Sequence, residues 1–203
     1  MKILKVISVA TIAALTFACG ADNDEGSTSE LDGTWVGTCS ADGDKFSKET
    51  QMFGSGQVTA TFSDYSDVSC ATETLAIAIS NPFSTGAAVT TPAGAKEIMS
   101  SPTTKVTVTL KTDELVALYN GTVVGIAATC GGGFVKNKAK EVTAASCGSN
   151  LEGVFATTNS YNIYKIDGTK LYFGACGDAG TATDCTSAAK RPTTLDTDFS
   201  TKS

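Results

Sequence analysis

Strict alternation of apolar and polar side chains is the feature of this 203-residue sequence that most constrains its fold. The segment TKVTVTLKT, residues 104–112, alternates strictly: Val106, Val108 and Leu110 occupy the even positions between lysines and threonines at the odd positions. Successive side chains of a strand point to opposite faces of a sheet, so this pattern predicts a half-buried antiparallel strand. The same alternation runs through QVTATFS, residues 57–63, and TLAIAIS, residues 74–80.

A hairpin and several weaker strands extend this pattern. The segment SYNIYKIDGTKLYFG, residues 160–174, places two aromatic-rich runs around Asp167 and Gly168, and Asp-Gly between such runs is a strong signal for a tight hairpin turn. Weaker strand candidates are residues 34–41, 45–53, 95–99, 132–137 and 140–145. Many short alternating strands predict an all-β fold, which is an antiparallel barrel or, alternatively, a β-sandwich.

One helix and one long loop interrupt the strands. Residues 113–120, DELVALYN, predict a short helix that Thr112 or Asp113 can cap and Gly121 can end. Residues 81–94, NPFSTGAAVTTPAG, are small and turn-forming, and they predict a long loop.

The N-terminal residues have the pattern of an export signal that ends at a cysteine. Lys2 and Lys5 precede an apolar run from Val6 to Ala18, too short to span a bilayer comfortably, so residues 1–18 are expected to be a signal peptide. The segment LTFAC that ends at Cys19 resembles the lipobox of bacterial lipoproteins. This resemblance implies lipidation of Cys19, which anchors the mature chain to a membrane. Gly20, in place of an aspartate after the cysteine, resembles the pattern of lipoproteins that are sorted to the outer membrane.

Composition then divides the remaining chain into a tether and one domain. Residues 19–30 have no aliphatic or aromatic side chain that could join a core, and they predict a lipidated flexible tether before a single domain at 31–203. The formal net charge of −6 becomes −8 when Lys2 and Lys5 leave with the signal peptide. An acidic surface disfavours nucleic acid as a partner.

The seven cysteines fit an exported chain in which one is lipidated and six are paired. If Cys19 carries lipid, the other six form an even set, which most simply makes three disulfides. Many pairings are open in principle, and we favour sequential ones because each closes a modest loop between neighbouring strands. These pairs are Cys39 with Cys70, Cys130 with Cys147, and Cys176 with Cys185.

The motifs of metal centres and common enzymes are missing from the sequence. The chain has no histidine and no C-x-x-C, so we expect no metal site and no cofactor. A serine or cysteine nucleophile would need lysine or a carboxylate as its base, and G-x-S-x-G does not occur. We therefore expect no catalytic residues and no enzymatic activity.

A lone tryptophan and a lone arginine carry a resemblance to a known fold. Trp35, in Gly33-Thr34-Trp35, opens the first strand, and Arg191 follows the last predicted hairpin. Here the chain resembles the lipocalins and the wider calycin group, whose first strand begins with G-x-W and whose chain ends with a basic residue across that indole. This resemblance implies an up-and-down antiparallel barrel in which Trp35 and Arg191 form a barrel-closing cation–π pair.

A second resemblance covers most of the mature chain. Bacterial lipoproteins with lipocalin-like domains combine a Gly-Thr-Trp opening and a following cysteine with a later D-x-x-C and a final Arg-Pro-Thr segment. Here these are Gly33 to Cys39, Asp67 with Cys70, and Arg191 to Thr193. The resemblance implies fold and anchoring rather than a particular activity.

Two functions are consistent with these features. The first is a non-enzymatic, structural or surface-interaction module of the outer membrane, whose loops at 81–94 and 177–190 meet a protein partner. The alternative is a carrier that holds a small apolar ligand inside the barrel. Under either function the expected interior residues are Phe62, Leu75, Ile77, Val106, Val108, Leu110, Ile163, Leu171 and Phe173.

Overall fold

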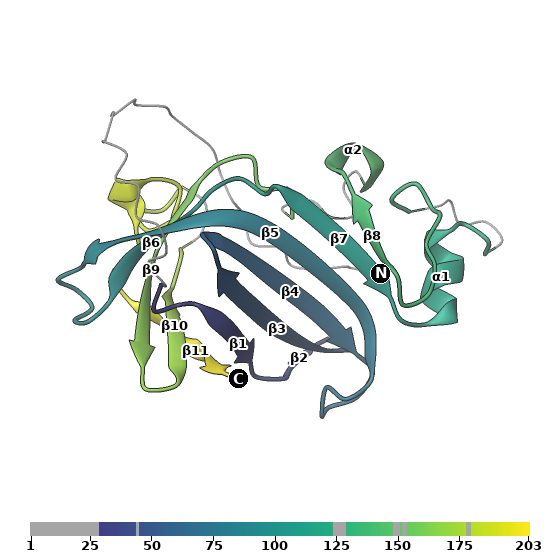
Figure 1. Ribbon diagram of the computed structural model, residues 1–203, viewed down its shortest axis with the longest axis horizontal. Coiled ribbons are helices and arrows are strands. Elements are labelled where there is room, and N and C mark those ends of the chain that lie inside the picture. Colours follow the sequence, from purple (N-terminus) through teal and green to yellow (C-terminus); the bar gives the residue numbers. More distant parts are fainter. Residues whose placement is uncertain (1–28, 44, 124–128, 148–150, 152–153, 178–179) are drawn as a thin grey trace.

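The chain forms a closed eight-stranded antiparallel barrel with a smaller extension at one end (Figure 1). The computed structural model describes residues 29–43, 45–123, 129–147, 151, 154–177 and 180–203. The barrel strands, in ring order, are β1 (Gly33–Gly37), β3 (Lys45–Gly54), β4 (Gln57–Tyr65), β5 (Glu73–Ala88), β6 (Lys96–Ser100), β9 (Ser160–Asp167), β10 (Lys170–Gly174) and β11 (Leu195–Lys202). The ring closes because β11 pairs with β1, with Trp35 opposite Lys202. The expected all-β antiparallel barrel is therefore confirmed.

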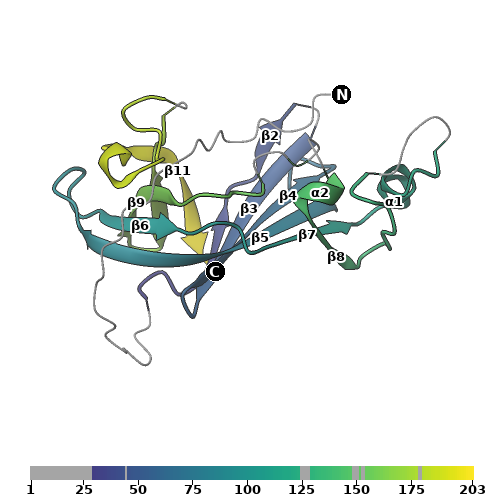
Figure 2. The same cartoon turned by 90° about the horizontal axis from the view of Figure 1, so that it is seen from above.

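The long strand β5 joins the barrel to the extension (Figures 1 and 2). Its first half pairs with β4 on one side and with β7 (Lys105–Leu110) on the other, and its second half pairs with β6. Strand β8 (Ala139–Val142) pairs with β7, and the short β2 (Ser40–Asp42) pairs with β3. Helices α1 (Asp113–Tyr119) and α2 (Ala144–Cys147) lie in the extension, and a 3-10 turn, η2 (Ala188–Lys190), precedes β11.

The barrel and the extension have separate hydrophobic cores. Near one barrel end, Trp35 and Leu171 pack with Leu31, Phe53, Ile98 and Tyr164. In the extension, the alternating apolar side chains of β5 and β7 pack against β8, α1 and the Cys130–Cys147 disulfide. The two-residue period therefore places apolar side chains on one face of a sheet that continues from the barrel into the extension.

The predicted loop at 81–94 is wrong over its first half, because β5 continues to Ala88. Beyond Pro82, β5 extends past the end of β4 and pairs with β6 instead, with Thr85 opposite Ile98. The side chains from Ser84 to Ala88 are exposed, so they need not be apolar there. The turn that follows occupies residues 90–94.

The predicted strand at 132–137 is also wrong. Gly131, Gly132 and Gly133 all have positive φ angles, which coil the chain instead of extending it. Phe134 is then held by Asn120, whose amide donates to the Phe134 carbonyl at 2.9 Å and accepts from its N–H at 2.7 Å. The candidate at 140–145 is a strand only to Val142, after which α2 begins.

The predicted helix is confirmed, with its cap. Helix α1 starts after Thr112, whose side-chain oxygen accepts a hydrogen bond from the Leu115 N–H at 3.2 Å, and Gly121 follows it with φ +67°. In the part of the chain that the structure describes, no helix combines the length and the hydropathy needed to cross a bilayer.

All three sequential disulfides are confirmed: Cys39–Cys70, Cys130–Cys147 and Cys176–Cys185. The signal peptide at 1–18 and Cys19 lie outside the described residues. So does most of the tether, but its last two residues are part of the fold, because Ser29 and Glu30 hydrogen-bond to the domain.

Candidate functional site

One end of the barrel is closed by the segment that leads into β1. Leu31, fully buried, sits against Trp35, whose indole N–H donates to the Leu31 carbonyl at 2.7 Å. Glu30 reaches the opposite wall, where it accepts a hydrogen bond from the Tyr164 hydroxyl at 2.7 Å and pairs with Lys96 at 2.8 Å. The segment therefore crosses the barrel end from β1 to β6 and β9.

The predicted Trp35–Arg191 pair is wrong, because the cation over the indole is Lys202. The Lys202 ammonium lies 5.2 Å from the centre of the Trp35 ring, and the two residues are opposite each other across β1 and β11. Strand β11 follows Arg191 in the sequence and was not predicted. Its pairing with β1 places Lys202, a basic residue later in the sequence than Arg191, beside Trp35.

Arg191 instead lies on the outer face of the barrel. Its guanidinium is 5.4 Å from the centre of the Tyr161 ring and 3.3 Å from a carboxylate oxygen of Glu97. On β6 and β9, Glu97 and Tyr161 alternate with the inward-facing Ile98 and Asn162 and therefore face outward. The barrel wall thus separates Arg191 from Trp35. Arg191 fastens the segment before β11 to β6 and β9.

Above the closed end, the barrel encloses a pocket of about 270 Å³. Its wall comes from six strands, β3, β4, β5, β6, β9 and β10. The lining residues combine apolar and neutral polar side chains: Gln51, Phe53, Val58, Ala60, Phe62, Ile79, Asn81, Ile98, Ser100, Ser160, Asn162 and Phe173. Phe62 is 38% exposed, which places it where the pocket meets solvent. The volume is just below the roughly 300–1,000 Å³ typical of ligand pockets.

Two side-chain oxygens in this wall are buried without a partner. The Gln51 Oε1 and Asn81 Oδ1 atoms accept no hydrogen bond from any described residue. A buried acceptor left unpaired costs about 1–3 kcal/mol, so such groups are uncommon in native proteins and call for an explanation. Both oxygens belong to residues that line the pocket, where a bound molecule could donate to them.

A partly buried carboxylate lies beside Gln51 in this polar wall. Glu49 precedes Gln51 by two residues on β3 and stands opposite Phe62 on β4, so it shares the inward face of the barrel. The Gln51 Nε2 donates to a Glu49 carboxylate oxygen at 2.7 Å, which turns Oε1 of the same amide away from the carboxylate. Burial raises the pKa of Glu49, an effect that the hydrogen bond from Gln51 opposes.

The structure distributes the nine predicted interior residues among four places. Phe62 and Phe173 line the pocket, and Leu171 packs below it near Trp35. Ile163 is buried on the outer face, beside Gly174. The other five pack in the core of the extension: Leu75, Ile77, Val106, Val108 and Leu110. The polar members of the pocket, Gln51 and Asn81 among them, were missed because alternation marks only apolar residues.

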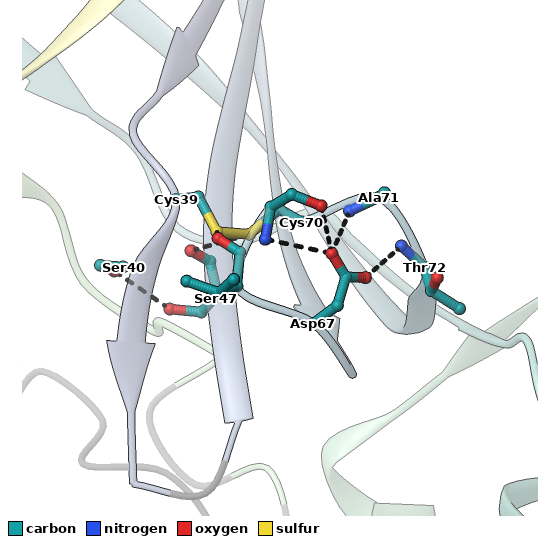
Figure 3. Close-up of a disulfide and its surroundings, with 9 residues drawn as sticks. Cys39, Ser40, Ser47, Asp67, Cys70, Ala71 and Thr72 are labelled. Carbon is teal, nitrogen blue, oxygen red and sulfur yellow. Dashed lines mark hydrogen bonds between the residues drawn. A yellow bond between two sulfur atoms is a disulfide. The ribbon is translucent and has the colours of Figure 1, made fainter.

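The Asp67–Cys70 motif builds a turn beside the first disulfide (Figure 3). One Asp67 carboxylate oxygen accepts from the Ala71 N–H at 3.2 Å and the other from the Thr72 N–H at 2.7 Å. The hydrogen bond from the Ser69 hydroxyl, together with these backbone bonds, holds the pKa of Asp67 far below its usual range. The aspartate therefore shapes the loop that presents Cys70 to Cys39.

The fold and this site define an eight-stranded antiparallel barrel, closed at one end, with an interior pocket. A scan against protein-family models finds no match to the chain, and a search of curated proteins finds none either.

Proposed function

We propose that this chain is an exported, lipid-anchored binding protein that holds a small amphipathic molecule in its barrel. The observation that carries the proposal is the pair of buried acceptors, on Gln51 and Asn81, in a pocket whose other walls include three phenylalanine rings. A molecule with an apolar body and hydrogen-bond donors satisfies both kinds of wall. We therefore favour the carrier, which was the alternative expected from the sequence, over the structural or surface-interaction module.

The cysteines support export and anchoring. Three disulfides are typical of chains that fold in an oxidising compartment outside the cytoplasm. They use six of the seven cysteines and leave Cys19, which follows the apolar run of the signal pattern. An acyl anchor there contributes about 0.8 kcal/mol per buried CH₂ and holds the barrel at a membrane surface.

Native mass spectrometry tests the binding function directly. The Cys19→Ser form, secreted by the organism of origin, is compared with the same sample after denaturation. We expect a stoichiometric additional mass that disappears on denaturation and identifies the molecule.

A pocket-filling variant provides the matched control. Ala60 lines the pocket, so Ala60→Phe is expected to fold and to lose the additional mass. Met52, on the outer face of the neighbouring strand and 56% exposed, gives a control of similar bulk in Met52→Phe, which should keep it. No additional mass in the parent form, or an additional mass that Ala60→Phe retains, would contradict a ligand inside the barrel.

Anchoring is tested separately by cell fractionation. The parent chain is expected in the membrane fraction, and Cys19→Ser in the soluble fraction, because the substitution removes the sulfur that carries the lipid. Membrane retention of Cys19→Ser would rule out this anchor and leave the binding function untouched.

A further inference from the structure

We propose that the barrel pocket selects a primary amine, with the ammonium group at the Gln51–Asn81 wall and the apolar body against the phenylalanines. This inference rests on the proposed binding function and names the chemical class of the ligand. The charge of the pocket, its two unpaired acceptors and its aromatic walls all favour this class of ligand.

The charge around the pocket favours a cation over an anion. None of the described residues that line it is basic or acidic, so a ligand carboxylate or phosphate would find no opposite charge there. The carboxylate next to this wall is Glu49, which accepts from the Gln51 amide at 2.7 Å on the same inward face of β3. In the partly buried barrel interior, this carboxylate attracts a cation beside the amide more strongly than it would in bulk water.

The open hydrogen bonds call for a donor. Gln51 Oε1 and Asn81 Oδ1 are acceptors, and an ammonium group carries three donors and no acceptor. Because the Gln51 amide already donates to Glu49, its oxygen is polarised and is a better acceptor for a charged donor. A hydrogen bond with a charged partner is stronger than a neutral one, so both acceptors favour an ammonium over a hydroxyl.

The aromatic walls add a second attraction to the same charge. Phe53, Phe62 and Phe173 line the pocket, and the face of each phenyl ring carries a negative quadrupole that attracts a nearby cation. The pocket volume, about 270 Å³, limits the apolar body to one short chain or one ring.

Three probes of matched chain length separate the alternatives. Hexylamine, hexanol and hexanoate are titrated by calorimetry at neutral pH into ligand-free Cys19→Ser protein. Hexylamine is then protonated and hexanoate is ionised. We expect hexylamine to bind about tenfold more tightly than hexanol, from the difference between charged and neutral hydrogen bonds, and hexanoate to bind most weakly.

Glu49→Gln identifies the source of the preference. Glutamine keeps an oxygen that can accept from Gln51, so we expect the hexanol affinity to stay and the hexylamine affinity to fall toward that of hexanol, while the attraction from the two acceptors and the phenyl rings remains. Glu141→Gln, which removes an exposed carboxylate on β8, should leave all three affinities unchanged. Asn81→Leu, a second variant on another strand, should lower hexylamine affinity by removing one acceptor.

The outcomes separate the two proposals. Equal binding of hexylamine and hexanol by the parent protein would overturn the selection of amines and leave a binding pocket. A preference for hexylamine that Glu49→Gln does not reduce would overturn Glu49 as a source of that selection. If none of the probes binds and the native protein carries no additional mass, the binding function fails and the selection of amines fails with it.

Discussion

The Tyr164 hydroxyl donates a 2.7 Å hydrogen bond to Glu30 and thereby ties the segment before β1 to the far wall of the barrel. Glu30 also pairs with Lys96, the residue directly opposite Tyr164 in the β6–β9 ladder. The hydrogen bond from Lys96 is the main cause that lowers the pKa of Glu30, while burial above all raises the pKa of Tyr164. The end of the predicted tether is thus part of the barrel end.

Tyr164→Phe should destabilise the domain by about 1 kcal/mol, because it removes one hydrogen bond to a charged acceptor at a partly exposed site. Glu30→Gln should have a similar effect, and the double variant should lose less than the two single losses together. Urea unfolding of the four proteins measures this coupling. Strictly additive losses would show that the two side chains act independently.

Lys202, rather than Arg191, should be coupled to Trp35. In double-variant cycles built on Trp35→Phe, Lys202→Ala should show a coupling of about 0.5–1 kcal/mol, as expected for an exposed cation on an indole. Arg191→Ala should add to Trp35→Phe without coupling, because Arg191 contacts Tyr161 on the other face of the wall. Thermal unfolding of the variants measures both cycles, and coupling between Trp35 and Arg191 would contradict this geometry.

Asp184 should make the stability of the domain depend on pH in acid. Its carboxylate accepts from Lys190 Nζ at 2.8 Å and from the Thr186 hydroxyl at 2.6 Å, and the bond from Lys190 is the main cause that lowers its pKa far below the usual range. A lowered folded-state pKa stabilises the protein above the unfolded value, near 3.9, and this contribution is lost as the pH falls below it.

The melting temperature of Asp184→Asn should therefore lie below that of the parent protein at pH 5 and above, and the difference should shrink toward pH 2. Circular dichroism melts across this range measure it. Asp167→Asn, at the exposed hairpin turn, is the control and should show no comparable trend. A gap that stays constant down to pH 2 would mean that ionisation of Asp184 is not the cause.

Glu49→Gln should raise the melting temperature at neutral pH, in contrast to most substitutions of inward-facing residues. A carboxylate whose folded-state pKa is raised destabilises the folded protein where it must ionise, so its neutral replacement is stabilising there. The gain should disappear below about pH 4, where Glu49 is protonated in both states. Melts at pH 7 and pH 3 test this, and a lower melting temperature at pH 7 would contradict it.

The disulfide pairing, the all-β class and the one capped helix could all be predicted from the residues. Each depends on neighbours in the sequence: cysteines that close short loops, apolar side chains with a period of two, and Thr112 just before DELVALY. The second half of β5 and all of β11 could not be predicted in this way. Their side chains are largely exposed, so they carry no apolar alternation, and β11 also depends on pairing with β1 at the other end of the chain.

The sequence by itself determined the alternation that makes a sheet and the cysteines that staple it, because both are local patterns of burial and spacing. Tertiary structure alone decided which cation covers Trp35 and what lines the pocket. Trp35 meets Lys202 only through the pairing of the first strand with the last. Gln51 and Asn81 share one wall because ring closure turns one parity of β3 and β5 inward. The first depends on the register between the first and last strands and the second on closure of the whole ring, and no local pattern of residues specifies either.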